Sequence, residues 1–122
     1  QIEEFISGRA NFLEWMIEQL HSDNLSRAAQ DIIAERVRQQ TDEGWTPEHD
    51  DEHDLSELAR AGACYALMAA GYRPDHDMIR WLWPFEGEWP DPSDTRRRDL
   101  VKAAATILAD IERLDRAEER RS

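Results

Sequence analysis

The chain lacks the features that mark several common classes of protein. Cys64 is its only cysteine, so no disulfide can form within the chain, and its apolar surroundings predict a small core residue. Only five glycines and five prolines occur among 122 residues. No apolar run approaches the roughly 18 residues that cross a membrane, and no signal peptide is visible. We therefore expect a single domain that works in the cytoplasm without a membrane.

Basic residues are also scarce. Lys and Arg number 15 against 27 Asp and Glu, which gives a formal net charge of −12. Because nucleic acids and anionic membranes bind basic surfaces, direct nucleic-acid binding is not expected. A divalent cation, a basic partner protein or mimicry of DNA is compatible with this charge.

The glycines and prolines cluster at a few places along the chain. Between those places apolar residues recur with helical spacing, which predicts an all-α fold. We expect a bundle of four main helices plus a short helix and an aromatic loop. The main helices are predicted at about 2–21, 25–41, 51–70 and from 93 onward, with the short helix at 75–83. Residues 1–122 then form one helical domain, with an N-terminal helix over 1–23, a core over 24–116 and a solvated charged tail over 117–122.

Two of these helices carry specific expectations about burial. Between Leu58 and Ala70 only Arg60 is charged, so this helix is predicted to be central and buried. The last helix is predicted to bury one face, which comprises Leu100, Val101, Ala104, Ile107, Leu108, Ile111 and Leu114.

The segment from Asp42 to Glu57 is unusually acidic. It holds eight Asp or Glu residues and no Lys or Arg, with His49 and His53 among them. A bound Mg²⁺ or Mn²⁺ would relieve this repulsion, and carboxylates are the ligands these cations prefer. The candidate ligands are Asp50, Asp51, His53, Asp54 and Glu57. The alternative is an acidic first helical turn capped by Asp50 or Asp51, followed by ordinary solvated charge.

The helix predicted at 25–41 changes character along its length. Its apolar stripe continues into Arg36 and Gln40, flanked by Glu35 and Gln39, so polar groups occupy the buried side. One interpretation is an internal ion pair of the Arg36–Glu57 type. The other is a polar pocket in which Glu35, Asp54 and Glu57 hold a metal while Arg36, Arg38 or Arg60 meets a phosphate.

Aromatic and basic clusters complete the candidates. Trp81, Trp83, Phe85 and Trp89 lie close together in sequence, which favours a cover for the core or a subunit interface, and hence a homo-oligomer. A platform for stacking bases is the alternative. Trp45 is a separate stacking candidate or an anchor for its loop. Arg96, Arg97 and Arg98 suggest a carboxylate or phosphate partner, most simply a carboxylate of the acidic segment.

Several strings between residues 30 and 116 resemble small uncharacterised proteins of tailed phages and prophages. From Glu35 to His53 the chain reads Glu-Arg-Val-Arg-Gln-Gln-Thr-Asp-Glu-Gly-Trp-Thr-Pro-Glu-His-Asp-Asp-Glu-His. The other strings are Glu57-Leu-Ala-Arg-Ala, Trp83-Pro, Arg97-Arg-Asp-Leu-Val-Lys-Ala-Ala-Ala and Ile111-Glu-Arg-Leu-Asp.

A weaker resemblance is to the all-α nucleoside triphosphate pyrophosphohydrolases of the MazG type. Those families place Glu-Glu-x-x-Glu on one helix and Glu-x-x-Asp on the next, and bind Mg²⁺ across the pair. Here Gln39 replaces an acid after Glu35, and Asp54-Leu-Ser-Glu57 carries its acids in reversed order.

This resemblance implies an all-α protein that binds or cleaves a nucleotide with Mg²⁺, or with Mn²⁺ as a substitute. Glu35 and Glu57 are the candidate catalytic residues. The candidate metal ligands are Glu35, Asp50, Asp51, His53, Asp54 and Glu57, and the candidate nucleotide-binding residues are Arg36, Arg38, Trp45 and Arg60.

A non-enzymatic role is the alternative function. A small acidic domain encoded by a phage would suit an anti-defence inhibitor or a DNA mimic that binds a basic host protein in the host cytoplasm. The two functions differ in how the acids are arranged. An enzyme gathers them in one pocket, whereas a mimic spreads them along a surface.

Overall fold

The computed structural model describes residues 13–14, 16–18, 25–52 and 56–121. Its elements are α3 (Arg27–Thr41), α4 (Pro47–Asp51), α5 (Glu57–Ala69), α6 (Asp77–Leu82) and α7 (Arg96–Arg121). No strand occurs in these residues, so the predicted all-α fold class is confirmed. The N-terminal helix predicted at 2–21 lies almost entirely outside the described residues.

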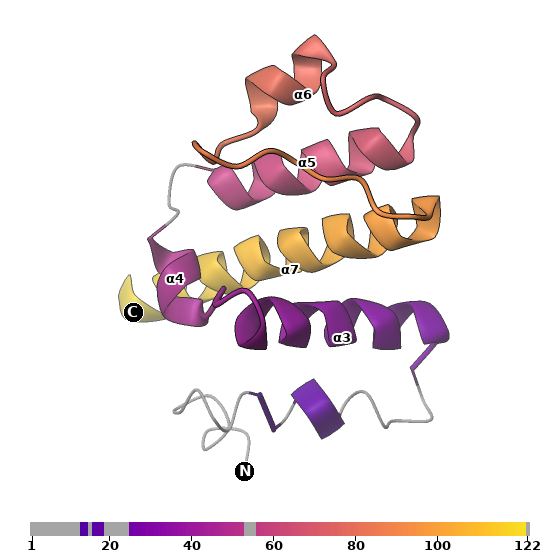
Figure 1. The fold of residues 1–122 in the computed structure, drawn as a ribbon. Coiled ribbons are helices and arrows are strands. Elements are labelled where there is room, and N and C mark those ends of the chain that lie inside the picture. Colours follow the sequence, from indigo (N-terminus) through magenta and orange to yellow (C-terminus); the bar gives the residue numbers. More distant parts are fainter. Residues whose placement is uncertain (1–12, 15, 19–24, 53–55, 122) are drawn as a thin grey trace.

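The helix at the centre of the fold is α7. Figure 1 shows it between α3 and α5, with α6 on the far side of α5 and α4 beside the C-terminal half of α7. The helix predicted over 51–70 corresponds to α5, which lies between α6 and α7 and is largely buried as predicted, although α7 rather than α5 occupies the centre of the fold. The longest helix, α7, lies in the middle of the fold, with one side packed against α3 and another against α5.

The break between α4 and α5 differs from the prediction. The Thr46 side chain accepts a hydrogen bond from the backbone N–H of His49 at 3.2 Å, and Pro47 follows at the first helical position. This cap and proline start a helix earlier than the predicted 51, because proline fits the first turn without losing a hydrogen bond. Asp50 and Asp51 are consequently inside α4 and cap nothing. A second helix, α5, then begins at Glu57.

The other helices follow the predictions more closely. Ser26 caps α3 by accepting from the backbone N–H of Ala29 at 3.1 Å, and α6 falls within the short helix predicted at 75–83. The last helix begins at Arg96 and continues to Arg121, so the charged tail over 117–121 is helical.

The apolar core is small and lies mainly between α5, α6 and α7. It includes Leu58, Ala61, Cys64, Met68, Ile79, Val101, Ala105 and Ala109. The prediction for Cys64 is confirmed, since its side chain is fully buried and its thiol donates to the backbone carbonyl of Ile79 at 3.7 Å. Burial raises the pKa of this thiol to about 11.

The buried side of α7 matches the prediction only in part: Val101 is buried and Ala104 and Leu108 are half-buried, but four other predicted residues are exposed. Leu100, Ile107, Ile111 and Leu114 are between 43% and 52% exposed. The sides that face α3 and α5 instead carry small or polar groups such as Ala105, Thr106, Ala109 and Arg113. The prediction was wrong for these four residues because α3 presents polar side chains to α7, and these need polar neighbours rather than leucine and isoleucine.

Candidate functional site

A buried arginine joins three segments of the fold. Arg36 donates from Nη2 to Asp50 at 2.7 Å, from Nε to Glu112 at 3.0 Å and from Nη1 to the carbonyl of Trp45 at 3.2 Å. The Arg36 and Asp50 side chains are both fully buried. The predicted internal ion pair is thus present, but its acids are Asp50 and Glu112 rather than Glu57. A guanidinium enclosed in this way cannot meet a phosphate, so the prediction of Arg36 as a nucleotide ligand is wrong.

The short helix α4 is also fastened to the C-terminal end of α7. Asp51 accepts from Arg116 Nη2 at 2.8 Å and lies 3.5 Å from Arg120 Nη1. Arg116 also donates to the carbonyl of Pro47 at 3.3 Å. Asp50 and Asp51 therefore position α4, and with it the Trp45–His49 segment.

Glu35 lies in a second network of charges, on the side of α3 that faces α7. Its carboxylate accepts from both Nε and Nη2 of Arg38, at 2.8 and 2.7 Å, and from Arg98 Nη2. Arg38 in turn donates to Glu43 at 2.9 Å. Burial alone would raise the pKa of Glu35, but the two arginines hold it below its ordinary value. Glu35 is therefore ionised at neutral pH.

Tyr65 of α5 and Lys102 of α7 border this network. The Lys102 Nζ lies 5.9 Å from the centroid of the Tyr65 ring. Burial, with the nearby carboxylates of Glu43 and Glu35, raises the pKa of Tyr65 to about 12. Three cationic side chains thus gather where α3, α5 and α7 meet. We refer to Arg38, Arg98 and Lys102 as the basic cluster.

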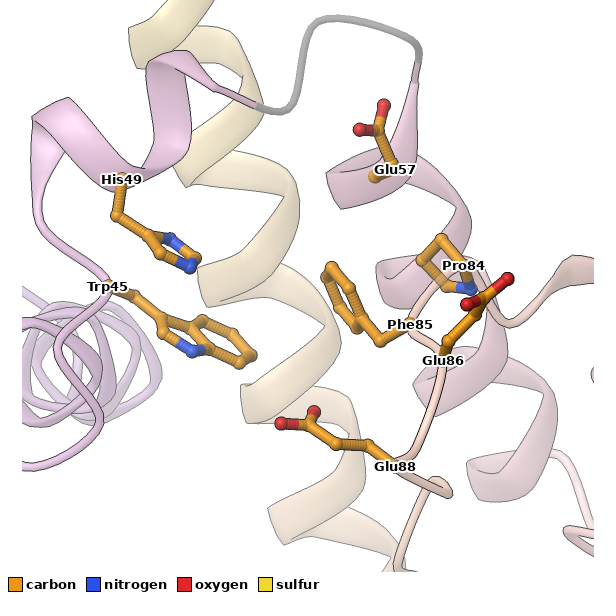
Figure 2. A pocket seen from close by; sticks show the side chains of 7 residues that line it. All are labelled: Trp45, His49, Glu57, Pro84, Phe85, Glu86 and Glu88. Atoms are coloured by element: carbon orange, nitrogen blue, oxygen red, sulfur yellow. The ribbon is translucent and has the colours of Figure 1, made fainter.

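A pocket of about 300 Å³ opens beside α4. Figure 2 shows the rings of Trp45 and His49 on one side and Phe85 on the other, with α7 passing behind the gap. Its described lining holds three carboxylates and no Lys or Arg. The lining residues are Trp45, His49, Glu57, Pro84, Phe85, Glu86 and Glu88.

Local geometry sets both walls of the pocket. Gly44 adopts a left-handed φ of +73°, and the backbone N–H of Trp45 then donates to the carbonyl of Gln39 at 2.8 Å, which folds Trp45 against the end of α3. On the other wall, Trp83 Nε1 donates to the carbonyl of Glu88 at 3.2 Å and closes the turn that carries Phe85.

A chain of aromatic rings connects the pocket to the basic cluster. The ring centroids of Trp45 and Phe85 are 6.3 Å apart, those of Phe85 and Trp83 are 5.4 Å apart, and those of Trp83 and Tyr65 are 5.9 Å apart. Tyr65 then contacts Lys102. The pocket and the basic cluster are therefore joined by an unbroken row of neighbouring rings, of which Trp83 and Tyr65 are half-buried.

The predicted site residues are divided between these places. Glu57 and Trp45 line the pocket, whereas Glu35 and Arg38 lie in the charge network. The structure thus does not bring Glu35 and Glu57 to one pocket. Arg60 is elsewhere, since its Nε donates to the carbonyl of Leu82 at 3.0 Å.

The predicted metal ligands are tested only in part. His53 and Asp54 lie outside the described residues. Among the residues that are described, no group of three or more His, Cys, Asp or Glu side chains is placed to hold a metal ion. The Mg²⁺ site over the acidic segment therefore stays a prediction.

Two of the three arginines that begin α7 have carboxylate partners, as predicted, but those partners lie on α3 rather than in the acidic segment, and Arg96 instead donates to the backbone carbonyl of Ala69 at 3.0 Å. Arg97 pairs with Asp31 at 2.8 Å and Arg98 pairs with Glu35. Sequence analysis missed Tyr65, Lys102, Glu86 and Glu88. The four-residue spacing of Arg98 and Lys102 was the one available signal for the basic cluster.

The aromatic group was predicted to cover the core, to form an interface or to stack bases. Trp83 and Phe85 are partly buried, and Trp83 packs on the core. Trp81 is 78% exposed and Trp89 is 51% exposed. The group therefore divides into an inner pair that shapes the pocket and an outer pair on the surface.

No family model, curated protein or solved structure matches this chain. No described helix is long and apolar enough to cross a membrane.

Proposed function

We propose that the protein binds a nucleotide along the surface that runs from the pocket to the basic cluster. The base occupies the pocket and the phosphates meet Arg38, Arg98 and Lys102. The observation that supports this most directly is the ring chain that links an aromatic pocket to a group of cations. A pocket of about 300 Å³ is at the small end of the range for ligand sites and suits a single base.

The pocket has the chemistry to hold a base. The Trp45 and Phe85 rings offer faces on which a base stacks, and stacking contributes about 1–3 kcal/mol per base. Glu57, Glu86 and Glu88 carry oxygens that only accept hydrogen bonds when ionised, so they suit the N–H groups at the edge of a base.

The basic cluster has the chemistry to hold phosphates. Arg38 and Arg98 are about one-third exposed or more at the side chain, so both reach solvent while they contact Glu35. A guanidinium has five N–H donors and binds phosphate oxygens in pairs. When these donors turn to a phosphate, the carboxylates of Glu35 and Glu43 lose cationic partners.

Mg²⁺ suits the arrangement in which Arg38 and Arg98 contact a phosphate and no longer neutralise Glu35 and Glu43. Protein sites usually hold Mg²⁺ through one or two carboxylates together with substrate phosphates, rather than through a complete protein cage. Glu35 and Glu43 supply two carboxylates beside the proposed phosphate position. With the ion bound, water would add across the α–β phosphoanhydride of a triphosphate and release a nucleoside monophosphate and pyrophosphate. The catalytic residue that fits this role is Glu35, and Glu57 is assigned to the base.

The test is to titrate the protein with a panel of dNTPs and NTPs, with and without Mg²⁺, by calorimetry, and to measure pyrophosphate release. Trp45→Ala and Arg98→Ala should each weaken binding about fivefold or more, by analogy with single stacking and charge-assisted contacts. Trp81→Ala and Arg73→Ala are the matched controls and should leave binding unchanged. Absence of binding to every nucleotide at millimolar concentration would refute the proposal.

A second candidate function follows from the carboxylates of the pocket. Three glutamates around aromatic rings also suit the side chain of a Lys or Arg from a basic partner protein, and the net charge of −12 would steer such a partner to the surface. An arginine-rich peptide should then bind with strong salt dependence. Glu86→Gln with Glu88→Gln should abolish this binding, whereas Arg98→Ala should leave it intact and so separate the two functions.

The predicted homo-oligomer also belongs among the proposals. Large apolar side chains exposed in patches mark interaction surfaces more often than scattered ones do. Exposed residues of this kind lie on α6 and its loop and, in larger number, along α7.

A further inference from the structure

The exposed apolar residues of α7 are regularly spaced. Leu100, Ala104, Ile107, Ile111 and Leu114 follow one another at alternating intervals of four and three residues. This is the spacing of a seam along which two helices pack in a coiled coil. We call these five residues the α7 stripe. Its four large members are between 43% and 52% exposed, although the neighbouring faces of α7 are buried against α3 and α5.

A row of alanines on α5 lies beside the α7 stripe. The two helices are antiparallel, since Arg96 at the start of α7 donates to the carbonyl of Ala69 at the end of α5, and Gly62 contacts Ile107 further along. At about 100° per residue, Ala59, Ala63, Ala66 and Ala70 then fall on the same side of the helix pair as the stripe. The two rows form one apolar face whose small residues leave room for a helix to approach closely.

Opposite charges bound the two ends of this face. Arg96 and Arg97 stand one turn before Leu100, and Glu118 stands one turn after Leu114 in line with the stripe. A second α7 that lies parallel would set arginine against arginine and glutamate against glutamate. A second α7 that lies antiparallel would set the basic end of each copy, with Arg96 and Arg97, against Glu118 of the other, while Arg97 also pairs with Asp31 of its own chain at 2.8 Å.

We propose that two copies of this chain pair through the α7 stripe, with their α7 helices antiparallel and a two-fold axis near Ile107. Leu100 of one copy then lies opposite Leu114 of the other, Ile107 meets its own counterpart, and the alanine rows of the two α5 helices face each other. The product is a four-helix layer of the kind in which apolar residues at coiled-coil spacing interdigitate. Two-fold pairs of this type are the commonest symmetric assemblies.

The dimer leaves the proposed nucleotide site open. Lys102 points about 160° away from the middle of the α7 stripe around the helix axis, at about 100° per residue. The pairing therefore goes beyond nucleotide binding and does not rest on it. It names the surface through which the proposed oligomer forms.

The first test is the mass of the protein in solution, measured by light scattering during size exclusion. The wild-type chain should have twice the mass of one copy. Ile107→Glu and Ile111→Glu should each yield a folded monomer, judged by unchanged helical circular dichroism, because each places two carboxylates at the two-fold seam. Trp81→Glu alters an even more exposed apolar residue on α6 and should leave the dimer intact. A monomeric wild type, or a dimer lost only in Trp81→Glu, overturns the proposal.

The second test fixes the orientation of the helices. In a Cys64→Ala background, Ile107→Cys should form a disulfide with its own copy under mild oxidation. Leu100→Cys alone should not, but a mixture of Leu100→Cys and Leu114→Cys chains should cross-link to each other. In a parallel pair Leu100→Cys would link to itself, and the Leu100→Cys and Leu114→Cys chains would not link to each other. Ile107→Cys would link to its own copy in either orientation. Because these readouts involve no ligand, the dimer and the nucleotide site can fail independently.

Discussion

The substitution Arg36→Met isolates the contribution of the buried ion pair. It removes the guanidinium that holds Asp50 at 2.7 Å, Glu112 at 3.0 Å and the carbonyl of Trp45 at 3.2 Å. Met has a similar length and fills most of the vacated space, so the loss is mainly electrostatic. Asp50 is then a fully buried carboxylate whose remaining neighbour is the His49 ring at 3.5 Å.

The expected loss is about 3–5 kcal/mol of unfolding free energy, which is typical when one partner of a buried pair is removed. This loss is smaller than the sum of three separate hydrogen bonds, because the Glu112 side chain is 18% exposed and water can replace part of its contact with Arg36. For a domain of this size the melting temperature should fall by roughly 10–20 °C. Urea titration followed by circular dichroism measures the same loss at constant temperature.

The pH dependence of this loss is a further check. Burial already raises the pKa of Asp50 above the ordinary value of an aspartate in the wild type, although Arg36 opposes the shift. Without Arg36 the folded-state pKa rises further above the unfolded value. The penalty is therefore absent at a pH below the unfolded pKa, grows as the pH rises from the unfolded pKa towards the folded one, and is complete above the folded one. Arg36→Met should be closer to wild type at pH 4 than at pH 7.

The matched control is Arg73→Met. Arg73 also pairs with a carboxylate, that of Asp75 at 3.2 Å, but both side chains are mostly exposed. Its removal should change stability by less than about 1 kcal/mol. The reasoning fails if Arg36→Met costs no more than Arg73→Met, or if Asp50→Asn in addition to Arg36→Met restores nothing.

Three other predictions concern single residues. Glu35→Gln should cost about 1–3 kcal/mol at pH 7. Because Arg38 and Arg98 outweigh burial and lower the folded-state pKa of Glu35, the difference from wild type should shrink as the pH falls below the ordinary pKa of a glutamate and be lost only as the pH falls through the lowered folded-state pKa. Thiol reagents should leave Cys64 unmodified in the folded protein up to pH 9, since burial raises its pKa to about 11, and should react at once in urea; fast labelling of the native state would contradict this. Gly62→Val should destabilise the fold by about 1–3 kcal/mol, because even a Cβ at Gly62 would lie 2.8 Å from Cγ1 of Ile107, and a variant as stable as wild type in urea would show that α5 and α7 can separate freely.

The parts of the fold that followed from the sequence are those set by local signals. Helical spacing and the Gly and Pro breaks predicted α3, α6 and most of α7, and the apolar run around Cys64 predicted its burial. The buried side of α3 was also predicted, because Arg36 and Gln40 continue an apolar stripe. These predictions need only the chain's own periodicity.

The parts that did not follow depend on which helices meet. The periodicity of α7 shows an apolar stripe, but it cannot show whether that stripe faces α5 or a second copy of the chain. The partner of Arg36 depended on where α4 lies, and α4 began earlier than predicted because of Thr46 and Pro47. Tyr65 and Lys102 come together only once α5 and α7 are packed side by side.

The predicted site illustrates the same distinction. Trp45 and Arg38 belong to the proposed nucleotide surface, and each was conspicuous in sequence. Arg36 was equally conspicuous for the same reason, a charge on a buried helix face, but it serves the fold. Sequence position alone does not distinguish an arginine that is satisfied by internal carboxylates from one that reaches solvent.

The ion pairs of Arg116 and Arg120 with Asp51 make the last turns of α7 part of the support of the proposed ligand pocket. One side of the pocket is carried by a helix of five residues, too short to hold its shape alone. Arg36 supports it through Asp50, and the rest of its support comes from side chains encoded some 65 positions later in the sequence. A protein shortened before Arg116 would keep every residue that lines the pocket and the Arg36–Asp50 pair but lose the contacts to Asp51, so the last turns of α7 should be retained in any shortened version used to study binding.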